Sequence, residues 1–386
     1  CHYVILPPEA ADGRKEGLFM KITCNRQQLV EAVSNVQRAV STKSSVPALE
    51  GILLKAEDNT VMLCGYDLEL GMTTVIPASI EEEGSIVLSA RLFGDIVRRM
   101  PADTVFIGAD EKFMTTITSG ASEYSIVGIP SQEFPELPSV TAETPVTISQ
   151  AVLKSMIRQT IFAVADTDAK PIHTGTLFEI GGGRIRLVSV DGYRLALREE
   201  PVSCGEEVSF VVPGKTLSEV LKLIKDDDSD LTMQVGRRHI LFNIGSYTVI
   251  SRLLEGEFLD YNAAIPKASS TEIFVWTRSF IESVERVSLL ITDRLKSPVR
   301  CIFSGNEIRV SCSTSIGRAN DQIEAKITGN DVEMGFNNRY LLDALRNTEG
   351  DEVRIELNGP LSPMKILPKE GDSFLFLVLP VRLKNE

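Results

Sequence analysis

One short stretch recurs three times along the chain, and its regular spacing constrains the fold more than any other feature. Residues 123–127 read EYSIV and are followed by EFPE at 133–136. The stretch returns 123 residues later as SYTVI at 246–250, followed by EFLD at 257–260. A shorter copy, SFLFL at 373–377, comes 127 residues after the second. Such spacing predicts three tandem copies of one structural unit.

The apolar pattern between these stretches also repeats. Asn25 and Gln28 match the N-cap and capping-box positions of a helix, and apolar residues follow at helical spacing, namely Leu29, Val33, Val36 and Val40. Further helix starts of this kind give a set of six, at residues 25, 89, 149, 214, 277 and 337. Each of the three units is therefore predicted to hold two half-repeats of one helix and about four strands.

This arrangement predicts an α+β fold. Ser89 is expected to cap the second helix and Pro101 to end it. An antiparallel sheet needs one buried face, so the two helices of a unit are expected to cover one side of its sheets. Proline-rich linkers after the first and second units predict three tandem domains, at residues 20–142, 143–268 and 269–386.

Residues 1–19 match nothing in the repeats. Met20 is interpreted as the natural start, and the segment before it as a vector-derived extension that does not belong to the fold. A native N-terminal arm is the alternative.

Length and composition fit this domain count. The 386 residues allow two to three domains at ~150 residues each. A hydrophobic content of 43% is ordinary for a globular protein, and no apolar run approaches the ~20 residues that span a bilayer, so no membrane partner is expected. Six scattered cysteines without a C-x-x-C pair indicate reduced thiols in the cytoplasm. With only three histidines, the sequence predicts neither a metal site nor a cofactor.

Charge is distributed unevenly between helices and the rest of the chain. The net charge of −13 argues, taken globally, against a nucleic-acid partner. The six predicted helices nevertheless carry 13 basic and 6 acidic residues, a net of +7, which leaves −20 elsewhere. If all six helices share one face, that face would attract a phosphate backbone without reading its sequence. Solvated helix faces rich in Lys and Arg are the alternative, and the repeat favours the functional interpretation.

Three motifs strengthen this interpretation: VDGYRLA at 190–196, EFLDY at 257–261 and LPVRL at 379–383. With the three paired-helix units they resemble the bacterial DNA polymerase III beta subunit family, the sliding clamps, over nearly the whole chain from Met20 to about Leu383. The resemblance implies a head-to-tail homodimer that closes a ring of six domains around duplex DNA and performs no catalysis. A row of three similar domains leaves a strand edge at each end, which a two-fold axis can pair.

The resemblance also implies which residues contact DNA. Lys43 matches a position where some members have a DNA-contacting arginine, and Arg91 and Lys215 match basic positions at the starts of two lining helices. The full expected set is Lys43, Arg91, Arg98, Arg158, Lys170 and Lys215. The loop at 166–172 departs from members with aromatic residues there, because it has proline and isoleucine and keeps only Lys170 as a cation.

A hydrophobic cleft between the second and third domains is implied as well. In the family it takes short peptides from the DNA polymerase III alpha subunit, the clamp-loader complex, other polymerases and repair proteins. The matching residues here are Gly192, Tyr193, Arg194, Leu195, Leu259, Leu377, Leu379, Pro380, Val381, Arg382 and Leu383. The alternative for the apolar members, above all Leu195 and Leu377, is that they are strand core.

Other signals have simpler interpretations. Gly214, Lys215 and Thr216 resemble the end of a phosphate-binding loop, but Ser209 replaces its first glycine, so a helix start is predicted. The three glycines at 181–183 predict a hairpin turn. The acidic runs at 81–83 and 226–228 are interpreted as solvated surface.

The competing function is a repeat enzyme with its site between domains. Asp166, Asp168 and Asp191 would then be the first acids to test. A stable species of one chain's mass in solution would argue against the ring.

Overall fold

The computed structural model describes residues 18–140, 145–167, 170–203, 207–292, 294–295 and 297–383. Most of the expected N-terminal extension and the expected boundary at 142–143 lie outside these residues. The described chain falls into two compact units. One holds residues up to 139 together with 246–250, and the other holds 140–245 and the residues from 251 on.

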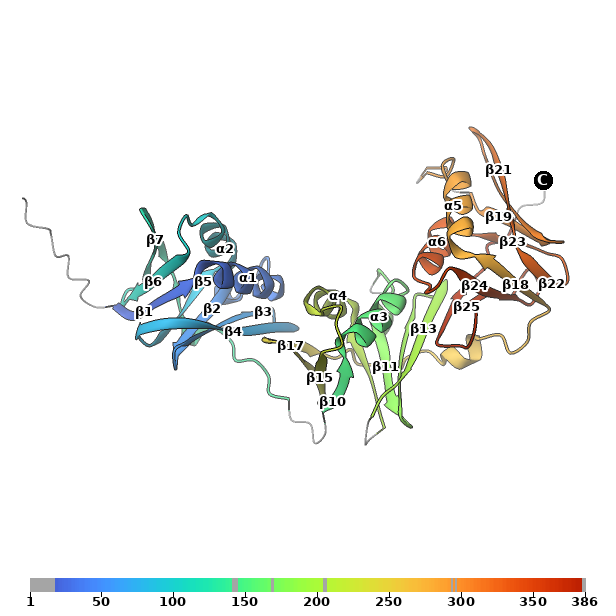
Figure 1. The fold of residues 1–386 in the computed structure, drawn as a ribbon. Helices are drawn as coiled ribbons and strands as arrows, with labels where there is room; N and C mark the ends of the chain where they lie inside the picture. The colour runs from blue at the N-terminus through green and yellow to red at the C-terminus, as the bar shows by residue number, and fades with distance from the viewer. Residues whose placement is uncertain are drawn as a thin grey trace, which may run out of the picture. The chain divides into compact units, whose positions relative to one another are not determined.

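The first unit contains two sheets that share one long strand (Figure 1). Strand β4 pairs with β3 through residues 71–77 and with β1 through residues 78–82. Beyond β1 the order continues to β6, β7 and β8, and beyond β3 it continues to β2, β5 and β9. The strands are β1 (Leu18–Asn25), β2 (Gly51–Glu57), β3 (Thr60–Tyr66), β4 (Leu70–Glu82), β5 (Gly84–Ser89), β6 (Thr104–Asp110), β7 (Met114–Ser119), β8 (Ser122–Val127) and β9 (Ile129–Pro130).

The first strand begins before Met20. Leu18 and Phe19 belong to β1, and the ring of Phe19 packs edge-on against Phe113 at a centroid distance of 5.9 Å. The last two residues of the segment expected to lie outside the fold are therefore part of the sheet.

The second unit holds the remaining strands in three groups (Figure 1). The orders are β10-β15-β16, then β14-β11-β12-β13-β26-β25-β24-β18-β22, and β21-β20-β19-β23. The strands are β10 (Val146–Ser149), β11 (Gly175–Gly181), β12 (Arg184–Val190), β13 (Arg194–Pro201), β14 (Val208–Pro213), β15 (Asp230–Val235), β16 (His239–Ile244), β18 (Thr271–Trp276), β19 (Val299–Ser304), β20 (Glu307–Thr314), β21 (Gly317–Glu324), β22 (Lys326–Gly329), β23 (Val332–Phe336), β24 (Glu352–Leu357), β25 (Met364–Pro368) and β26 (Phe374–Val378).

Six α-helices begin within one residue of the predicted positions. They are α1 (Arg26–Val36), α2 (Ala90–Arg99), α3 (Gln150–Ile161), α4 (Gly214–Leu223), α5 (Thr277–Ser288) and α6 (Asn338–Arg346). Asn25 caps α1 by accepting a hydrogen bond from the Gln28 amide at 3.1 Å, and Asn337 caps α6 in the same way. Ser89 occupies the N-cap position of α2, but its hydroxyl makes no capping bond within the described chain, so that part of the prediction was wrong.

The helices pack in pairs, as an α+β repeat requires. Helix α1 contacts α2, α3 contacts α4, and α5 contacts α6. In the second unit all four helices lie on the same side of their sheets in Figure 1. Short 3₁₀ helices connect some elements, namely η1 (Gln37–Ala39), η2 (Pro47–Glu50), η3 (Ser131–Glu133), η4 (Pro171–Thr174) and η5 (Tyr261–Ala264).

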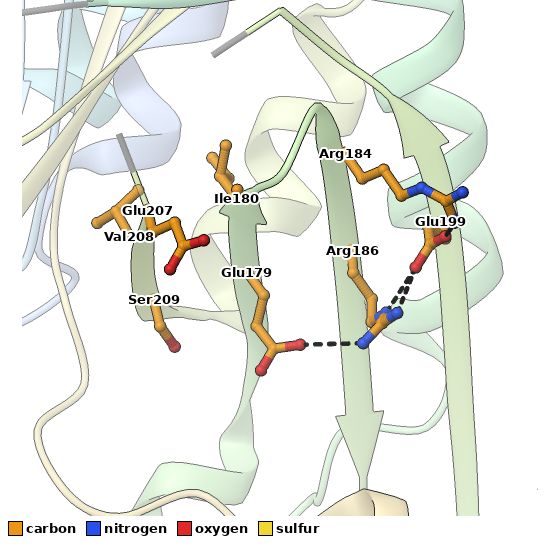
Figure 2. Close-up of a pocket in the computed structure, with 9 residues that line it drawn as sticks. Glu179, Ile180, Arg184, Arg186, Glu199, Glu207, Val208 and Ser209 are labelled. Atoms are coloured by element: carbon orange, nitrogen blue, oxygen red, sulfur yellow. Dashed lines mark hydrogen bonds and ion pairs between the residues drawn. The ribbon is translucent and has the colours of Figure 1, made fainter. Parts of the chain in front are cut away.

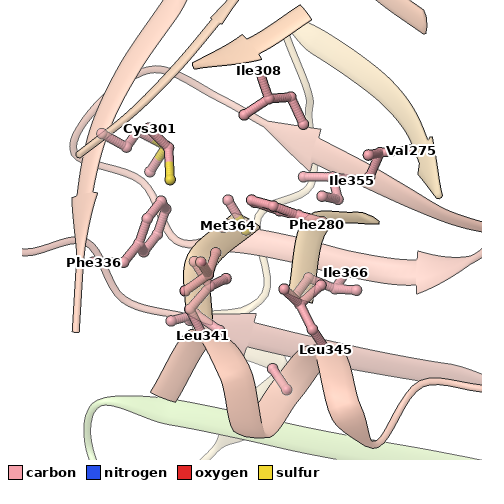
Figure 3. Packing of buried hydrophobic residues seen from close by; sticks show 14 of the residues in the cluster. Val275, Phe280, Cys301, Ile308, Phe336, Leu341, Leu345, Ile355, Met364 and Ile366 are labelled. Atoms are coloured by element: carbon pink, nitrogen blue, oxygen red, sulfur yellow. The ribbon is translucent and has the colours of Figure 1, made fainter. Parts of the chain in front are cut away.

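The apolar periodicity of the helices fills the core. In the third repeat, Phe280 of α5 and Leu341 and Leu345 of α6 are fully buried against strand residues such as Ile355 and Ile366 (Figure 3). Burying a leucine or phenylalanine side chain stabilises the fold by roughly 1.5–3 kcal/mol. This packing explains why one helix face is apolar while the other remains free for charged residues.

The recurring stretch forms a strand in all three repeats, which confirms the tandem pattern. Its copies lie in β8, in β17 (Tyr247–Arg252) and in β26. Their burial differs, because Tyr124 in β8 is 42% exposed while Phe374 in β26 is fully buried. The glycines at 181–183 form the predicted hairpin turn between β11 and β12, with positive φ at Gly182 and Gly183.

Candidate functional site: an apolar groove and a basic helix surface

A tight loop between β12 and β13 presents Tyr193 to solvent. Asp191 Oδ1 accepts hydrogen bonds from the amides of Tyr193 and Arg194, at 2.9 and 3.0 Å. Gly192 adopts φ +89°, a left-handed conformation that glycine takes without strain. As a result the Tyr193 side chain is 61% exposed, while the next residue, Arg194, turns inward and is only 7% exposed.

Arg194 makes contacts with two repeats of the second unit. Its Nε lies 2.9 Å from Asp191 Oδ2, and its Nη1 lies 2.5 Å from Asp343 Oδ2 on α6. Its guanidinium also stacks over the Tyr340 ring at 4.6 Å. Burial, and then the charge of Asp191, raises the pKa of Tyr340.

The last described residues line an apolar groove of about 680 Å³. The Leu379 amide donates to the Tyr193 carbonyl at 2.9 Å, and the Val381 amide donates to the Gly335 carbonyl at 2.8 Å. These two bonds fix the segment while Leu379 and Val381 remain 38% and 42% exposed. The lining residues are Glu333, Met334, Gly335, Pro360, Leu361, Pro363, Leu379, Pro380, Val381, Arg382 and Leu383.

Five of the expected cleft residues thus meet in one groove, and Gly192, Tyr193 and Arg194 are not among its lining residues. Leu195 and Leu377 do not line it either. They face each other across the β13–β26 pair and are 2% and 1% exposed, within a core cluster. Their placement is that of strand core, the alternative considered for them. The reason is strand alternation, which turns these two side chains inward on neighbouring strands.

Leu259 lies in a second pocket, of about 600 Å³. The pocket is lined by residues 170–173 and 255–260, so it also contains Lys170, one of the cations expected at DNA. Leu259 is 43% exposed there. His173 packs edge-on against Phe258 at a centroid distance of 5.5 Å, and burial, followed by the charge of Lys170, lowers the pKa of His173.

A third pocket, of about 360 Å³, lies on the sheet of the second repeat and is dominated by charge (Figure 2). Arg186 lies between Glu179, at 3.6 Å, and Glu199, which also pairs with Arg184. Arg186 also donates to the hydroxyl of Tyr261 at 2.9 Å. Paired charges of this kind hold the segment around Tyr261 against the sheet.

The expected DNA-contacting residues are all exposed. Lys43, Arg91 and Arg98 belong to the first unit, and Arg158, Lys170 and Lys215 belong to the second. Within their observed bounds the six helices carry 12 basic and 6 acidic residues, so their net charge of +6 remains positive. Arg98 forms an ion pair with Asp95 at 3.0 Å, whereas Arg91 and Arg158 have no ion-pair partner among the described residues.

The acids suggested for a competing enzyme do not form a site in the described residues. Asp191 is occupied by Arg194 and two loop amides, Asp166 is exposed, and Asp168 lies outside the described residues. In that same part of the chain, no group of three or more His, Cys, Asp or Glu side chains could hold a metal ion. No described helix is long and apolar enough to span a membrane.

Several groove residues, and Tyr340 beside Tyr193, were not singled out from the sequence as site residues. Leu361, which is 81% exposed, stands between Pro360 and Pro363 in an irregular turn, and Gly335 lies under the terminal segment. Tyr340 stacks on Tyr193 at a centroid distance of 5.7 Å. A leucine flanked by prolines was the signal available in the sequence for Leu361, and nothing local distinguishes Tyr340 from other residues on the apolar face of α6.

Comparison with known proteins agrees with this geometry. Three family models match in order: the N-terminal domain of the DNA polymerase III beta subunit at residues 20–138, its central domain at 147–260 and its C-terminal domain at 262–382. The beta sliding clamp of Bacillus subtilis is 34% identical over 376 residues, covering 94% of this chain and 100% of the relative.

Solved structures give the same result. The crystal structure of the Bacillus subtilis DNA polymerase sliding clamp superimposes with a TM-score of 0.92 at 33% identity, covering 95% of this chain and 100% of the other. A Pseudomonas aeruginosa sliding clamp bound to griselimycin superimposes with a TM-score of 0.89 at 26% identity, covering 94% and 100%.

The fold defines a protein of three tandem clamp domains, and its groove is an apolar surface to which a partner can bind. The chain belongs to the DNA polymerase III beta subunit family, the beta sliding clamps. It is thus a DNA sliding clamp, a processivity factor and a non-catalytic accessory subunit of DNA polymerase III.

Proposed function

We propose that two copies of this chain close head to tail into a ring around duplex DNA, in the cytoplasm. The observation that carries the proposal is a pair of open strand edges. Within the described residues, β8 of the first unit pairs only with β7, and β21 of the second pairs only with β20. An open edge can accept a partner strand, and a two-fold axis brings β8 of one copy to β21 of the other twice.

Side chains on β8 support this use of the edge. Tyr124 and Val127 are 42% and 69% exposed, so pairing would remove apolar surface from water. Glu123 on β8 and Arg318 on β21 carry opposite charges, while of the two acids on β21 Asp321 is paired with Arg286 within its own chain.

The ring is tested by mass and by topology. Native mass spectrometry should show a species of twice the 42.4 kDa chain mass. After loading by a clamp loader, the protein should remain on circular DNA and be lost when the circle is cut. A stable single-chain species, or equal retention on cut and closed DNA, would contradict the ring.

We propose that Lys43, Arg91, Arg98, Arg158, Lys170 and Lys215 contact the DNA backbone. Support comes from their exposure and from the net positive charge of the helices. Contacts of this kind are electrostatic, so retention should fall with salt and be independent of sequence. Arg158 and Arg91 are the strongest members, since an unpaired cation has no internal ion pair to give up.

We propose that the apolar groove binds short peptides of the DNA polymerase III alpha subunit, the clamp-loader complex, other polymerases and repair proteins, and that it also binds griselimycin. The exposed side chains of Leu361, Leu379 and Val381 supply the apolar surface on which such peptides are anchored. Pro380, Arg382 and Leu383 also line it, and the neighbouring loop with Gly192 and Tyr193 holds Leu379 through the Tyr193 carbonyl. In this proposal Leu259 extends the contact into the second pocket. Tethering by such a groove raises the local concentration of the polymerase at the primer end.

Deletion of residues 381–386 tests the groove. The deletion removes Val381 and its bond to Gly335, so griselimycin binding measured by calorimetry should be lost. The dimer should persist, because β8 and β21 are untouched. Normal griselimycin binding by the deletion variant would place the site elsewhere.

We further propose domain boundaries at 20–142, 143–268 and 269–386, preceded by an extension. The three family models, which end at 138, 260 and 382, support them. Limited proteolysis should cut first near 142 and near 268, and fragments with other termini would contradict the boundaries.

A further inference from the structure

An exposed tryptophan lies in a corner between two sheets of the third repeat, outside the apolar groove. Trp276, the single tryptophan of the chain, ends β18 and is 58% exposed. It lines a pocket of about 1050 Å³, which shares no lining residue with the groove. Tryptophan is mostly buried in folded proteins, so an indole left exposed in a hollow indicates a contact surface.

Strand pairing explains why Trp276 faces charged side chains. Trp276 pairs with Glu352 of β24, and Phe274 pairs with Lys326 of β22 (Figure 1). Side chains of paired residues stand on the same face of a sheet, and positions two apart on a strand share a face, so these four side chains lie together. A second wall of the pocket comes from β20 and β21, through Glu307, Arg309, Gln322 and Glu324.

Two charges of this pocket, Glu324 and Lys326, have no ion-pair partner among the described residues. The other charges are paired: Glu307 Oε1 lies 3.0 Å from Arg309 Nε, and Glu352 pairs with a lysine outside the pocket. Glu324 lies directly opposite Glu307 in the β20–β21 register, and like charges in such positions repel each other. A cation that enters the pocket relieves this repulsion.

We propose that this pocket is a docking site for an arginine-bearing segment of a partner protein. The guanidinium stacks on the face of Trp276 and donates hydrogen bonds to Glu324, which a planar and permanently charged group can do at once. None of the described cations of the chain itself stacks on Trp276. An acidic residue next to the arginine pairs with Lys326, so the segment that fits best carries an arginine beside an aspartate or a glutamate.

The charges of the pocket argue against a nucleic acid as its occupant. Three carboxylates and two cations line it, and one of these cations is already paired. The chain has a net charge of −13 while its helices are basic, so the surface outside the helices is strongly acidic and repels a phosphate backbone.

The proposed ring leaves the pocket open. Pairing of the β21 edge with a strand of a second copy uses backbone groups, whereas Gln322 and Glu324 point from the face of the sheet. The docking site is therefore independent of the proposed uses of the groove and of the strand edges.

The single tryptophan makes the test direct, because its fluorescence reports on this pocket. When the full-length protein is titrated with the acetylated amide of Gly-Arg-Asp-Gly, the fluorescence of Trp276 should change in a saturable way. The same peptide with norleucine in place of arginine should bind about fivefold more weakly. Glu324→Gln should weaken binding of the arginine peptide by about fivefold. Glu272→Gln is the matched control, on the same strand and face as Trp276 but outside the pocket, and should leave affinity unchanged.

Four results would overturn the proposal. The first is a fluorescence response that does not saturate or is equal for the two peptides. The second is an affinity of Glu324→Gln equal to that of the wild type or of Glu272→Gln. Tighter binding of a single-stranded oligothymidylate than of the arginine peptide would assign the pocket to nucleic acid instead. Failure of acrylamide to quench Trp276 in the full-length protein would show that a second copy covers the pocket.

Discussion

The substitution Gly335→Ala is expected to displace the terminal segment, residues 379–383, because the added methyl group would collide with it. Gly335 lies in β23, and its carbonyl accepts the Val381 amide at 2.8 Å. A Cβ added there would lie 2.8 Å from the Val381 carbonyl oxygen and 2.7 Å from Cδ2 of Leu383. The Leu383 side chain can rotate away, but a backbone oxygen cannot. The segment must therefore move by about 0.6 Å to reach an ordinary 3.4 Å contact.

The magnitude follows from what this shift breaks. Loss or weakening of the Val381 hydrogen bond costs about 1 kcal/mol. Gly335 has ordinary strand geometry opposite Arg300, so alanine adds no backbone strain, and the free energy of unfolding should fall by only about 1–2 kcal/mol. Griselimycin affinity should fall by about tenfold, because the displaced segment carries Leu379 and Val381.

Urea denaturation and calorimetry measure the two effects separately. Gly236→Ala serves as the control, since its added Cβ would lie 3.3 Å from a methyl group of Val140 and 3.4 Å from the His239 carbonyl oxygen, and neither residue lines the groove. The control should retain wild-type affinity. If Gly335→Ala bound griselimycin as tightly as the control, residues 379–383 would not be a wall of the binding site.

Three further predictions concern other parts of the chain. Leu68→Gly should raise the free energy of unfolding, measured by urea denaturation, by about 0.5–1 kcal/mol, because Leu68 is exposed and has φ +75°, which glycine adopts without strain. A free energy of unfolding below that of the wild type would show that the Leu68 backbone is not strained. Reversing the charges of Lys43, Arg91 and Lys215 together should weaken retention on DNA equally for all sequences and reduce the salt slope by about 0.9 per lost contact; unchanged retention at low salt would reject their role. Burial raises the pKa of the Cys301 thiol to about 12, so it stays protonated at neutral and mildly alkaline pH and should react with thiol reagents only after unfolding.

The sequence predicted the helices well because caps and apolar spacing, which determine where a helix begins and which face is buried, depend on residues close together in the chain. Asn25 and Asn337 cap the helices they precede, and apolar residues at helical spacing define the buried face of each. The same signals could not predict where Leu195 and Leu377 point. Their burial depends on the pairing of β13 with β26, in which Leu195 and Leu377 are 182 residues apart in sequence. Neither strand's own sequence predicts this pairing.

The groove shows the same limit. Its terminal residues could be placed from the family resemblance, because the motif at 379–383 is contiguous. The roles of Asp343 and Tyr340 could not be predicted, since in the sequence of α6 they look like an ordinary acidic residue and a residue of the apolar face. Only the folded chain brings Asp343 and Tyr340 to Arg194, and Asp343 is 149 residues away in sequence.

The β13–β26 ladder makes the second and third repeats interdependent. Five residue pairs, from Arg194–Val378 to Arg198–Phe374, join strands that originate in different repeats. A gene fragment ending near residue 260 would therefore produce a protein whose β13 has lost its neighbour and is free to recruit strands from other molecules. Expression trials that divide the protein at this junction should yield aggregates, whereas a piece spanning both repeats should remain dispersed.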